Sequence, residues 1–153
     1  MRRLTDVSSS APFFRGGGAS ISVRIVAMAF KVSKREFETL VEQAISDLPA
    51  EFADFLEEVP IEIQDRASQK LRKRIGLKDG RLLLGLYTGV SRIRRSVEDS
   101  GRMPDVIYIF QQDHELICNS RAELVEQVRK TVLHEIGHHF GMSEEDLDRL
   151  GYG

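Results

Sequence analysis

The chain has 153 residues, of which 41% are apolar, enough for one domain with a modest hydrophobic core. Its formal net charge of −2 gives no overall basic field, so neither nucleic acid nor an anionic membrane surface is an expected partner. A single cysteine, Cys118, excludes an internal disulfide, and no apolar run is long enough to span a bilayer. We therefore expect a soluble protein of the cytoplasm, where thiols stay reduced.

The first 27 residues differ in composition from the rest of the chain. They contain three serines at 8–10, three glycines at 16–18, and four arginines against a single acid, Asp6. This composition fits a disordered tail, a targeting peptide, or a start assigned upstream of the true one at Met28. We expect residues 28–153 to form the folded domain and residues 1–27 to be a disordered extension or a mis-assigned start.

The first half of the domain carries clear helix and strand signals. A capping box at 33–36 opens a predicted helix that ends at Pro49. The next predicted elements are a strand at 59–63, a short basic helix at 66–75, and strands at 82–87 and 105–110. The loop between the last two strands carries four arginines, which either face solvent or have a functional role.

The second half is predicted to be helical. Another capping box at 120–123 opens a helix that should reach Phe140, with Gly141 as the residue that ends it. A further helix should begin at Ser143. This element order indicates the α+β class, with a small mixed or antiparallel sheet packed on the N-terminal helix and on the 120–140 helix.

The motif with the clearest chemistry is H-E-x-x-H, formed by His134, Glu135 and His138. Residues four apart on a helix project from nearly the same side, so the two imidazoles can bind one metal ion, for which zinc is the expected element. Glu135 is rotated by about 100° from His134. It can therefore act as general base towards a zinc-bound water without being a ligand.

The apolar residues of the same helix place this motif on a different side from the core. They recur at every fourth position and form one stripe: Leu124, Val128, Val132, Ile136 and Phe140. Each motif histidine follows a stripe residue by two positions, about 200° around the helix. We therefore expect the metal-binding side to face away from the core stripe, into a cleft.

The third ligand should be local or upstream, because only fifteen residues follow His138. Glu144 occupies the third-ligand position of the H-E-x-x-H-x-x-G-x-x-H pattern, and Gly141 can reverse the chain towards the metal. Alternatively, Glu144 is only an acid in the first turn of a helix. The rival ligands are His139, Asp146, Asp148 and His114, of which His139 projects too far round the helix and His114 is expected at the surface.

Residues 36–151 resemble a family of small bacterial zinc metallopeptidases with a minimal zincin-like domain. The resemblance rests on four groups of residues. Three give supporting matches: 37–41 with Leu48-Pro49, 84–89, and Pro104-Asp105 with Ile107-Tyr108. The most specific group is 131–141 with Leu147 and Leu150-Gly151. It implies a zincin-like α+β fold and one bound zinc. Unlike the metzincins, the chain has Glu at the third-ligand position and no later Met-turn.

We therefore expect a zinc-dependent metallopeptidase whose partner is a peptide or protein substrate. The strand at 105–110 is a candidate edge for pairing with that substrate, and Tyr87, Tyr108 and His139 are candidate substrate contacts. One alternative is a small bacterial endoribonuclease of rRNA maturation, which has the same ligand spacing but a glycine and a histidine where this chain has Glu135 and Glu144. The other is a non-catalytic zinc-binding adaptor. The sequence does not indicate an oligomeric state.

Overall fold

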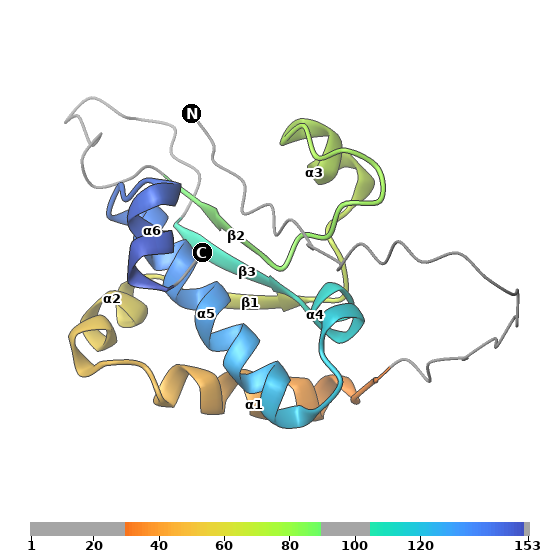
Figure 1. Ribbon diagram of the computed structural model, residues 1–153, viewed down its shortest axis with the longest axis horizontal. Coiled ribbons are helices and arrows are strands. Elements are labelled where there is room, and N and C mark those ends of the chain that lie inside the picture. The colour runs from red at the N-terminus through yellow and green to blue at the C-terminus, as the bar shows by residue number, and fades with distance from the viewer. Residues whose placement is uncertain (1–29, 90–104, 152–153) are drawn as a thin grey trace, which may run out of the picture.

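The computed structural model describes residues 30–89 and 105–151, so the N-terminal extension and the arginine loop fall outside the described residues. The elements in chain order are α1 (Lys34–Ser46), η1 (Ala50–Phe52), α2 (Ala53–Glu58), β1 (Ile61–Gln64), α3 (Gln69–Arg74), β2 (Gly85–Thr88), β3 (Val106–Phe110), α4 (Gln111–Ile117), α5 (Arg121–His139) and α6 (Glu144–Leu150) (Figure 1). Helices and a small mixed sheet make up one α+β arrangement, which confirms the predicted fold class. Within the described ranges, no helix combines the length and apolarity that crossing a membrane requires.

The three described strands form one sheet in the order β1-β3-β2. β1 is parallel to β3, with Ile63 opposite Ile109, and β2 is antiparallel to β3, with Tyr87 opposite Ile107. β3 is therefore the central strand, and its backbone is hydrogen-bonded on both sides. The expectation that strand 105–110 forms an edge for a substrate is wrong, because β1 and β2 already occupy both sides of it.

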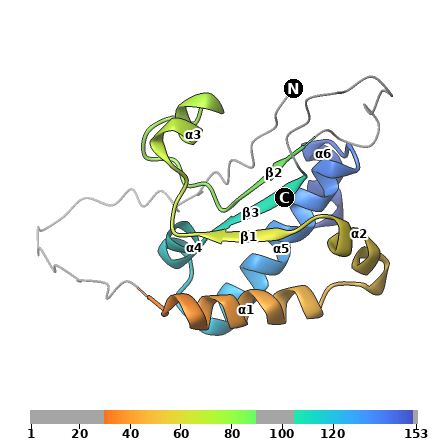
Figure 2. The ribbon, with the colours of Figure 1, turned by 180° about the vertical axis from the view of Figure 1, so that it is seen from behind.

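The main hydrophobic core lies between the sheet and the two long helices, α1 and α5. Figures 1 and 2 show both helices running along the same face of the sheet. Phe37 and Val41 of α1 meet Val132 of α5 and the inward side chains of Ile107 and Ile109, and all five are at most 2% exposed. α1 begins where predicted, because the Ser33 side chain caps it by accepting a hydrogen bond from the backbone N of Glu36.

A second, smaller apolar cluster fixes the α3 region to the opposite face of the sheet. It contains Leu77, Leu83, Leu86 and Phe110, together with Ala67. Figures 1 and 2 show α3 standing apart from α1 and α5. Since β-strand side chains alternate between faces, Phe110 points to this cluster while its neighbour Ile109 points to the main core.

The helix α4 is absent from the sequence prediction, and its composition explains why. Four of its side chains are polar and still buried, namely Gln111, Asp113, His114 and Glu115, so the apolar periodicity that marks a helix is missing. Each of these groups has partners; Asp113, for example, accepts hydrogen bonds from Arg66 Nε at 2.9 Å and from the backbone N of Leu83 at 2.7 Å. These bonds offset the cost of burying the polar groups.

His114, expected at the surface, is instead fully buried on α4. Its Nδ1 lies 2.9 Å from the Phe110 carbonyl oxygen and its Nε2 lies 3.2 Å from Thr131 Oγ1. Burial lowers the pKa of this imidazole to about 4, because the charged form loses its hydration. His114 is therefore neutral, with its one proton on Nδ1, where it donates to the Phe110 carbonyl.

Candidate metal centre

The helix that carries the motif begins and ends as its sequence predicts. Ser120 caps α5 by accepting a hydrogen bond from the backbone N of Glu123. At the other end, Phe140 is the C-cap and Gly141 has φ of 78°, a left-handed conformation that glycine adopts without strain. The backbone N of Met142 then donates to the Gly137 carbonyl at 3.0 Å, which completes the reversal towards α6.

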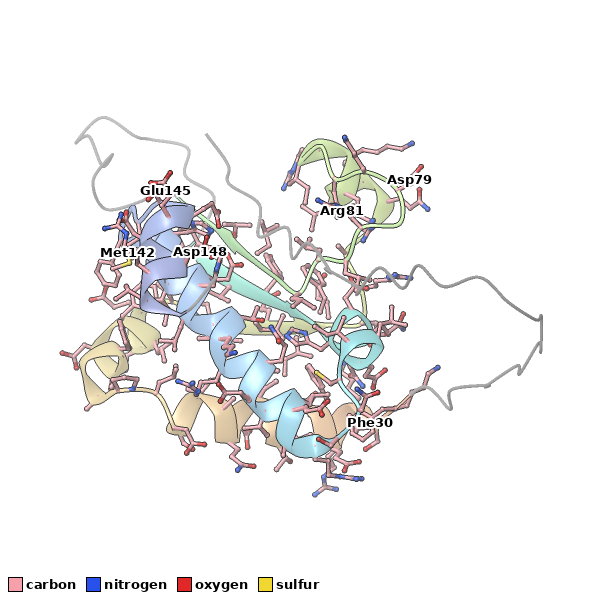
Figure 3. The ribbon with its side chains drawn as sticks, viewed as in Figure 1. Phe30, Asp79, Arg81, Met142, Glu145 and Asp148 are labelled. Atoms are coloured by element: carbon pink, nitrogen blue, oxygen red, sulfur yellow. The ribbon has the colours of Figure 1, made fainter. Side chains whose placement is uncertain are left out.

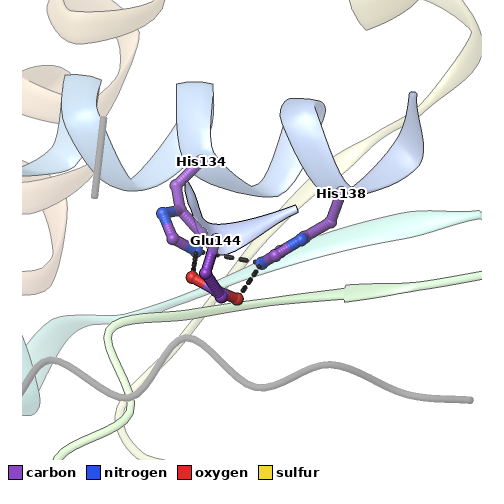
Figure 4. A group of neighbouring side chains, drawn as sticks. All are labelled: His134, His138 and Glu144. Atoms are coloured by element: carbon purple, nitrogen blue, oxygen red, sulfur yellow. Dashed lines mark hydrogen bonds and ion pairs between the residues drawn. The ribbon is translucent and has the colours of Figure 1, made fainter. Parts of the chain in front are cut away.

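The reversal brings Glu144, the first residue of α6, over the two motif histidines (Figure 4). His134 Nε2 and His138 Nε2 lie 2.9 Å apart. The Glu144 carboxylate lies 3.5 Å from His134 Nε2 through Oε2 and 3.3 Å from His138 Nε2 through Oε1. Among the described residues, these three side chains form the group whose donor atoms could hold a metal ion.

The donor set and its spacing fit zinc. Zinc in proteins prefers imidazole nitrogen and carboxylate oxygen at about 2.0–2.2 Å in tetrahedral geometry, which places neighbouring donors roughly 3.4 Å apart. The three observed separations, 2.9, 3.3 and 3.5 Å, lie around that value. Three protein donors leave one position of a tetrahedron for water or substrate, the arrangement of catalytic rather than structural zinc.

The metal-binding side of α5 is more enclosed than the expected cleft. His134 is only 7% exposed, and the neighbouring positions from Thr131 to Gly137 are all buried. α6 provides part of this cover, since a Cβ added to Gly137 would lie 2.3 Å from Leu147 Cδ2. Glycine at 137 therefore lets α6 pack closely enough for Glu144 to reach the histidines. Of the three donor side chains, that of Glu144 is the most exposed, at 51%.

Among the rival ligands, Asp146 has a different role. Its carboxylate accepts hydrogen bonds from the Ser143 hydroxyl at 2.7 Å and the Ser143 backbone N at 3.0 Å, which completes the capping box of α6. These bonds lower the pKa of the Asp146 carboxyl. Asp148 is exposed on the same helix, and the buried His114 bonds to Phe110 and Thr131 instead.

Glu135 is almost completely buried and lies against the strand β2. Its Oε2 accepts a hydrogen bond from the backbone N of Tyr87 at 2.7 Å. A Cβ added to Gly85 would lie 2.6 Å from Thr131 Cγ2 and 3.2 Å from Glu135 Oε1. Gly85 therefore permits α5 to approach β2 closely enough for this carboxylate to be fixed by the strand.

The three candidate substrate contacts lie in different places. The Tyr87 hydroxyl lies 2.8 Å from His139 Nδ1 and 2.9 Å from Asp105 Oδ1, so both Tyr87 and His139 have internal partners. His139 is only 1% exposed, with its ring centroid 4.4 Å from that of Phe55. Tyr108 is directed to the other face of the sheet, where it packs against the α3 cluster and stacks on Phe110. The structure thus brings Tyr87 and His139 together beside the metal centre, while Tyr108 belongs to a separate region.

Sequence reasoning did not identify Gly85, Gly137 or Asp105 as parts of the site. A glycine within a strand is a general sign of close backbone approach, and this signal was available for Gly85. The hydrogen bond from the Tyr87 hydroxyl to Asp105 joins residues on either side of a long loop, and no local sequence pattern indicates it.

Two imidazoles from α5 and a carboxylate from the first residue of α6 form a candidate metal site with the donor set of catalytic zinc centres. A family model described as "Zincin-like metallopeptidase" matches residues 56–153, and the chain belongs to this family. The match includes the whole sheet, α5 and α6, whereas α1 precedes it. A comparison with curated proteins found no match.

Proposed function

We propose that the protein is a zinc-dependent metallopeptidase that hydrolyses a peptide bond, with His134, His138 and Glu144 as metal ligands. The convergence of these three donor groups within 3.5 Å of one another supports the proposal most strongly. Membership of the zincin-like family favours a peptide or protein substrate over RNA. When zinc is bound by these residues, it supplies Lewis acidity, which activates water and polarises a carbonyl group.

Glu135 is the residue of this chain that would accept the proton as water attacks the carbonyl. It follows His134 directly and is rotated by about 100° from it, so it can reach a metal-bound water without being part of the donor group. Its hydrogen bond from the Tyr87 backbone holds the carboxylate in one orientation. A fixed base loses little freedom during the reaction, which favours catalysis.

The variant Glu135→Gln tests this role because the amide oxygen can still accept the hydrogen bond from Tyr87, while the side chain can no longer accept a proton. We expect the variant to retain its fold and about one zinc per chain by elemental analysis. Hydrolysis should fall by at least about 100-fold, as expected for loss of a general base. Loss of zinc together with activity would show that Glu135 is a ligand and contradict the assignment.

The substrate class is tested with a peptide library prepared from a whole proteome and analysed by mass spectrometry. Wild-type protein loaded with zinc should produce new peptide termini that are absent with Glu135→Gln. A parallel incubation with structured and single-stranded RNA tests the ribonuclease alternative. RNA cleavage that depends on Glu135 would replace the proposed function, and zinc binding without cleavage of either substrate would favour the adaptor.

A further inference from the structure

One residue of β2, Tyr87, binds two residues of α5 that lie four apart. Its backbone N donates to Glu135 Oε2 at 2.7 Å, and its hydroxyl lies 2.8 Å from His139 Nδ1. Positions four apart form one row along a helix. The motif histidines, His134 and His138, form the neighbouring row, since each precedes a residue held by Tyr87.

The hydroxyl of Tyr87 is itself fixed by Asp105, the residue before β3, at 2.9 Å. A hydroxyl has one proton, and an ionised carboxylate can only accept a hydrogen bond. The hydroxyl therefore donates to Asp105 and accepts from His139 Nδ1–H. The ring of His139 is packed against Phe55 and against the edge of the Tyr87 ring, with centroids 4.4 and 5.2 Å away.

We propose that Tyr87 is a positioning residue, which sets the rotation of α5 about its axis and thereby aims the imidazoles of His134 and His138 at the metal. Helix side chains reach about 5–6 Å from the axis, so a rotation of about 10° would move their ends by about 1 Å. Zinc–ligand distances tolerate only about 0.2 Å. The contacts of Tyr87 with the neighbouring row of α5 are therefore well placed to control how tightly both histidines bind zinc.

This role differs from the substrate contact that the sequence suggested for Tyr87, including a contact to an oxyanion formed on the substrate. Stabilising an oxyanion requires a hydrogen-bond donor, and the single hydroxyl proton of Tyr87 is already directed to Asp105. The backbone N–H is also engaged, by Glu135. The inference rests on the zinc centre of the proposed function and does not require peptide hydrolysis.

The test compares the zinc dissociation constants of wild type and Tyr87→Phe by competition with a chromophoric chelator. Removing the hydroxyl keeps the ring and the backbone N–H, and loss of such an outer contact typically weakens metal binding by about 10-fold to 100-fold. We expect a decrease in this range and altered visible absorption bands of the Co²⁺-substituted protein. Tyr108→Phe is the matched control for zinc affinity, because it removes the same hydroxyl group on the other face of the sheet.

The link through His139 gives two further variants. His139→Ala should weaken zinc binding as much as Tyr87→Phe, and the double variant should be little worse than either, since both changes break one contact. His139→Asn should recover most of the affinity, because the asparagine amide can donate from near the position of Nδ1.

An unchanged zinc affinity and Co²⁺ spectrum in Tyr87→Phe would overturn the inference, whether or not the melting temperature falls. An increase in KM alone for a cleaved peptide would also overturn it and would identify a substrate contact instead. If wild type bound no zinc, this inference and the proposed function would both fail. Zinc binding without any hydrolysis would contradict only the proposed function.

Discussion

Glu144 differs from the two histidines beside it in being half exposed, with 51% of its side chain accessible. Two features of the chain hold it over the imidazoles: the left-handed Gly141, and the Ser143–Asp146 capping box that starts α6. The same position, however, is favourable for any acid, because the first turn of a helix attracts negative charge. The distances to His134 and His138 favour the ligand role, and a pair of neighbouring variants can decide it.

We expect Glu144→Ala to weaken zinc binding by more than about 100-fold, since loss of a direct ligand should exceed the effect of losing an outer contact. The matched change is Glu145→Ala, which removes an exposed acid from the next position of α6 (Figure 3). That change should alter stability by only a few tenths of a kcal/mol and leave zinc affinity unchanged. Chelator competition measures the zinc affinity of the two variants. Equal effects would show that Glu144 is not a ligand and is only an acid in the first turn of α6.

For single residues, the contacts that could be predicted from the sequence are those between residues close together along the chain. His134 and His138 lie four apart on one helix, so helical geometry alone indicates that they converge, and Gly141 signals the turn that can return Glu144 to them. The contacts of Tyr87 with Glu135 and His139 span 48 and 52 residues. Such contacts are set by packing of the sheet on α5, for which the local sequence contains no signal.

The close packing of β2 against α5 is the part of the fold on which the site most depends. Gly85 lies at the closest approach, where any side chain would meet the branched Thr131 and the Glu135 carboxylate. The Thr131 side chain is hydrogen-bonded to the Gln127 carbonyl at 2.9 Å and cannot rotate away without losing that bond. The sheet and the helix must therefore separate if position 85 carries a larger residue.

We predict that Gly85→Ala lowers the free energy of unfolding by about 1–3 kcal/mol, the usual cost of overpacking, and also weakens zinc binding. The control is Gly80→Ala. Gly80 has φ of 80° but no atom within 4 Å of an added Cβ, so this variant should lose stability through backbone strain alone and keep its zinc affinity. Denaturant unfolding and chelator titration of both variants separate the two effects. Normal zinc binding in Gly85→Ala would show that the strand does not control the site.

Helix ends and amphipathic helices were predictable, because capping residues and apolar spacing are local properties. The prediction was wrong for strand 105–110 as an edge, and the helical segments η1, α2 and α4 were missed. Strand order depends on which segments cover which face, and the parallel pairing of β1 with β3 joins residues more than forty apart. α4 is stabilised by buried polar contacts, such as Glu115 Oε1 accepting from Val32 N at 3.1 Å, and not by an apolar stripe.

For the molecule as a whole, the buried His114 links stability to pH. Its pKa is lowered from 6.5 to about 4 in the folded protein, so between these values the unfolded chain binds a proton that the folded chain does not. Stability therefore rises with pH through this window and is lost as pH falls from 6.5 to 4. The loss amounts to about 2 kcal/mol between pH 7 and pH 5 and about 3 kcal/mol over the full window.

The variant His114→Asn should remove this dependence, because asparagine does not titrate and can still donate a hydrogen bond to the Phe110 carbonyl. We expect wild type to lose about 2 kcal/mol more than the variant when urea unfolding is measured at pH 7 and pH 5. Contributions from all other groups are common to both proteins and cancel in the difference. Identical pH dependences would show that His114 is protonated in the folded state near its ordinary pKa.

The short sequence span of the metal centre also affects how zinc can stabilise the protein. A ligand that binds only the folded state raises stability by about 2.7 kcal/mol at a concentration 100 times its dissociation constant. Here all three donors lie between positions 134 and 144, so an unfolded chain, in which a single helical turn forms transiently, still presents two imidazoles at a suitable spacing. Zinc bound to that chain reduces the net stabilisation. Distant contacts such as those of Tyr87 exist only after folding, and they increase the difference in zinc affinity between the two states.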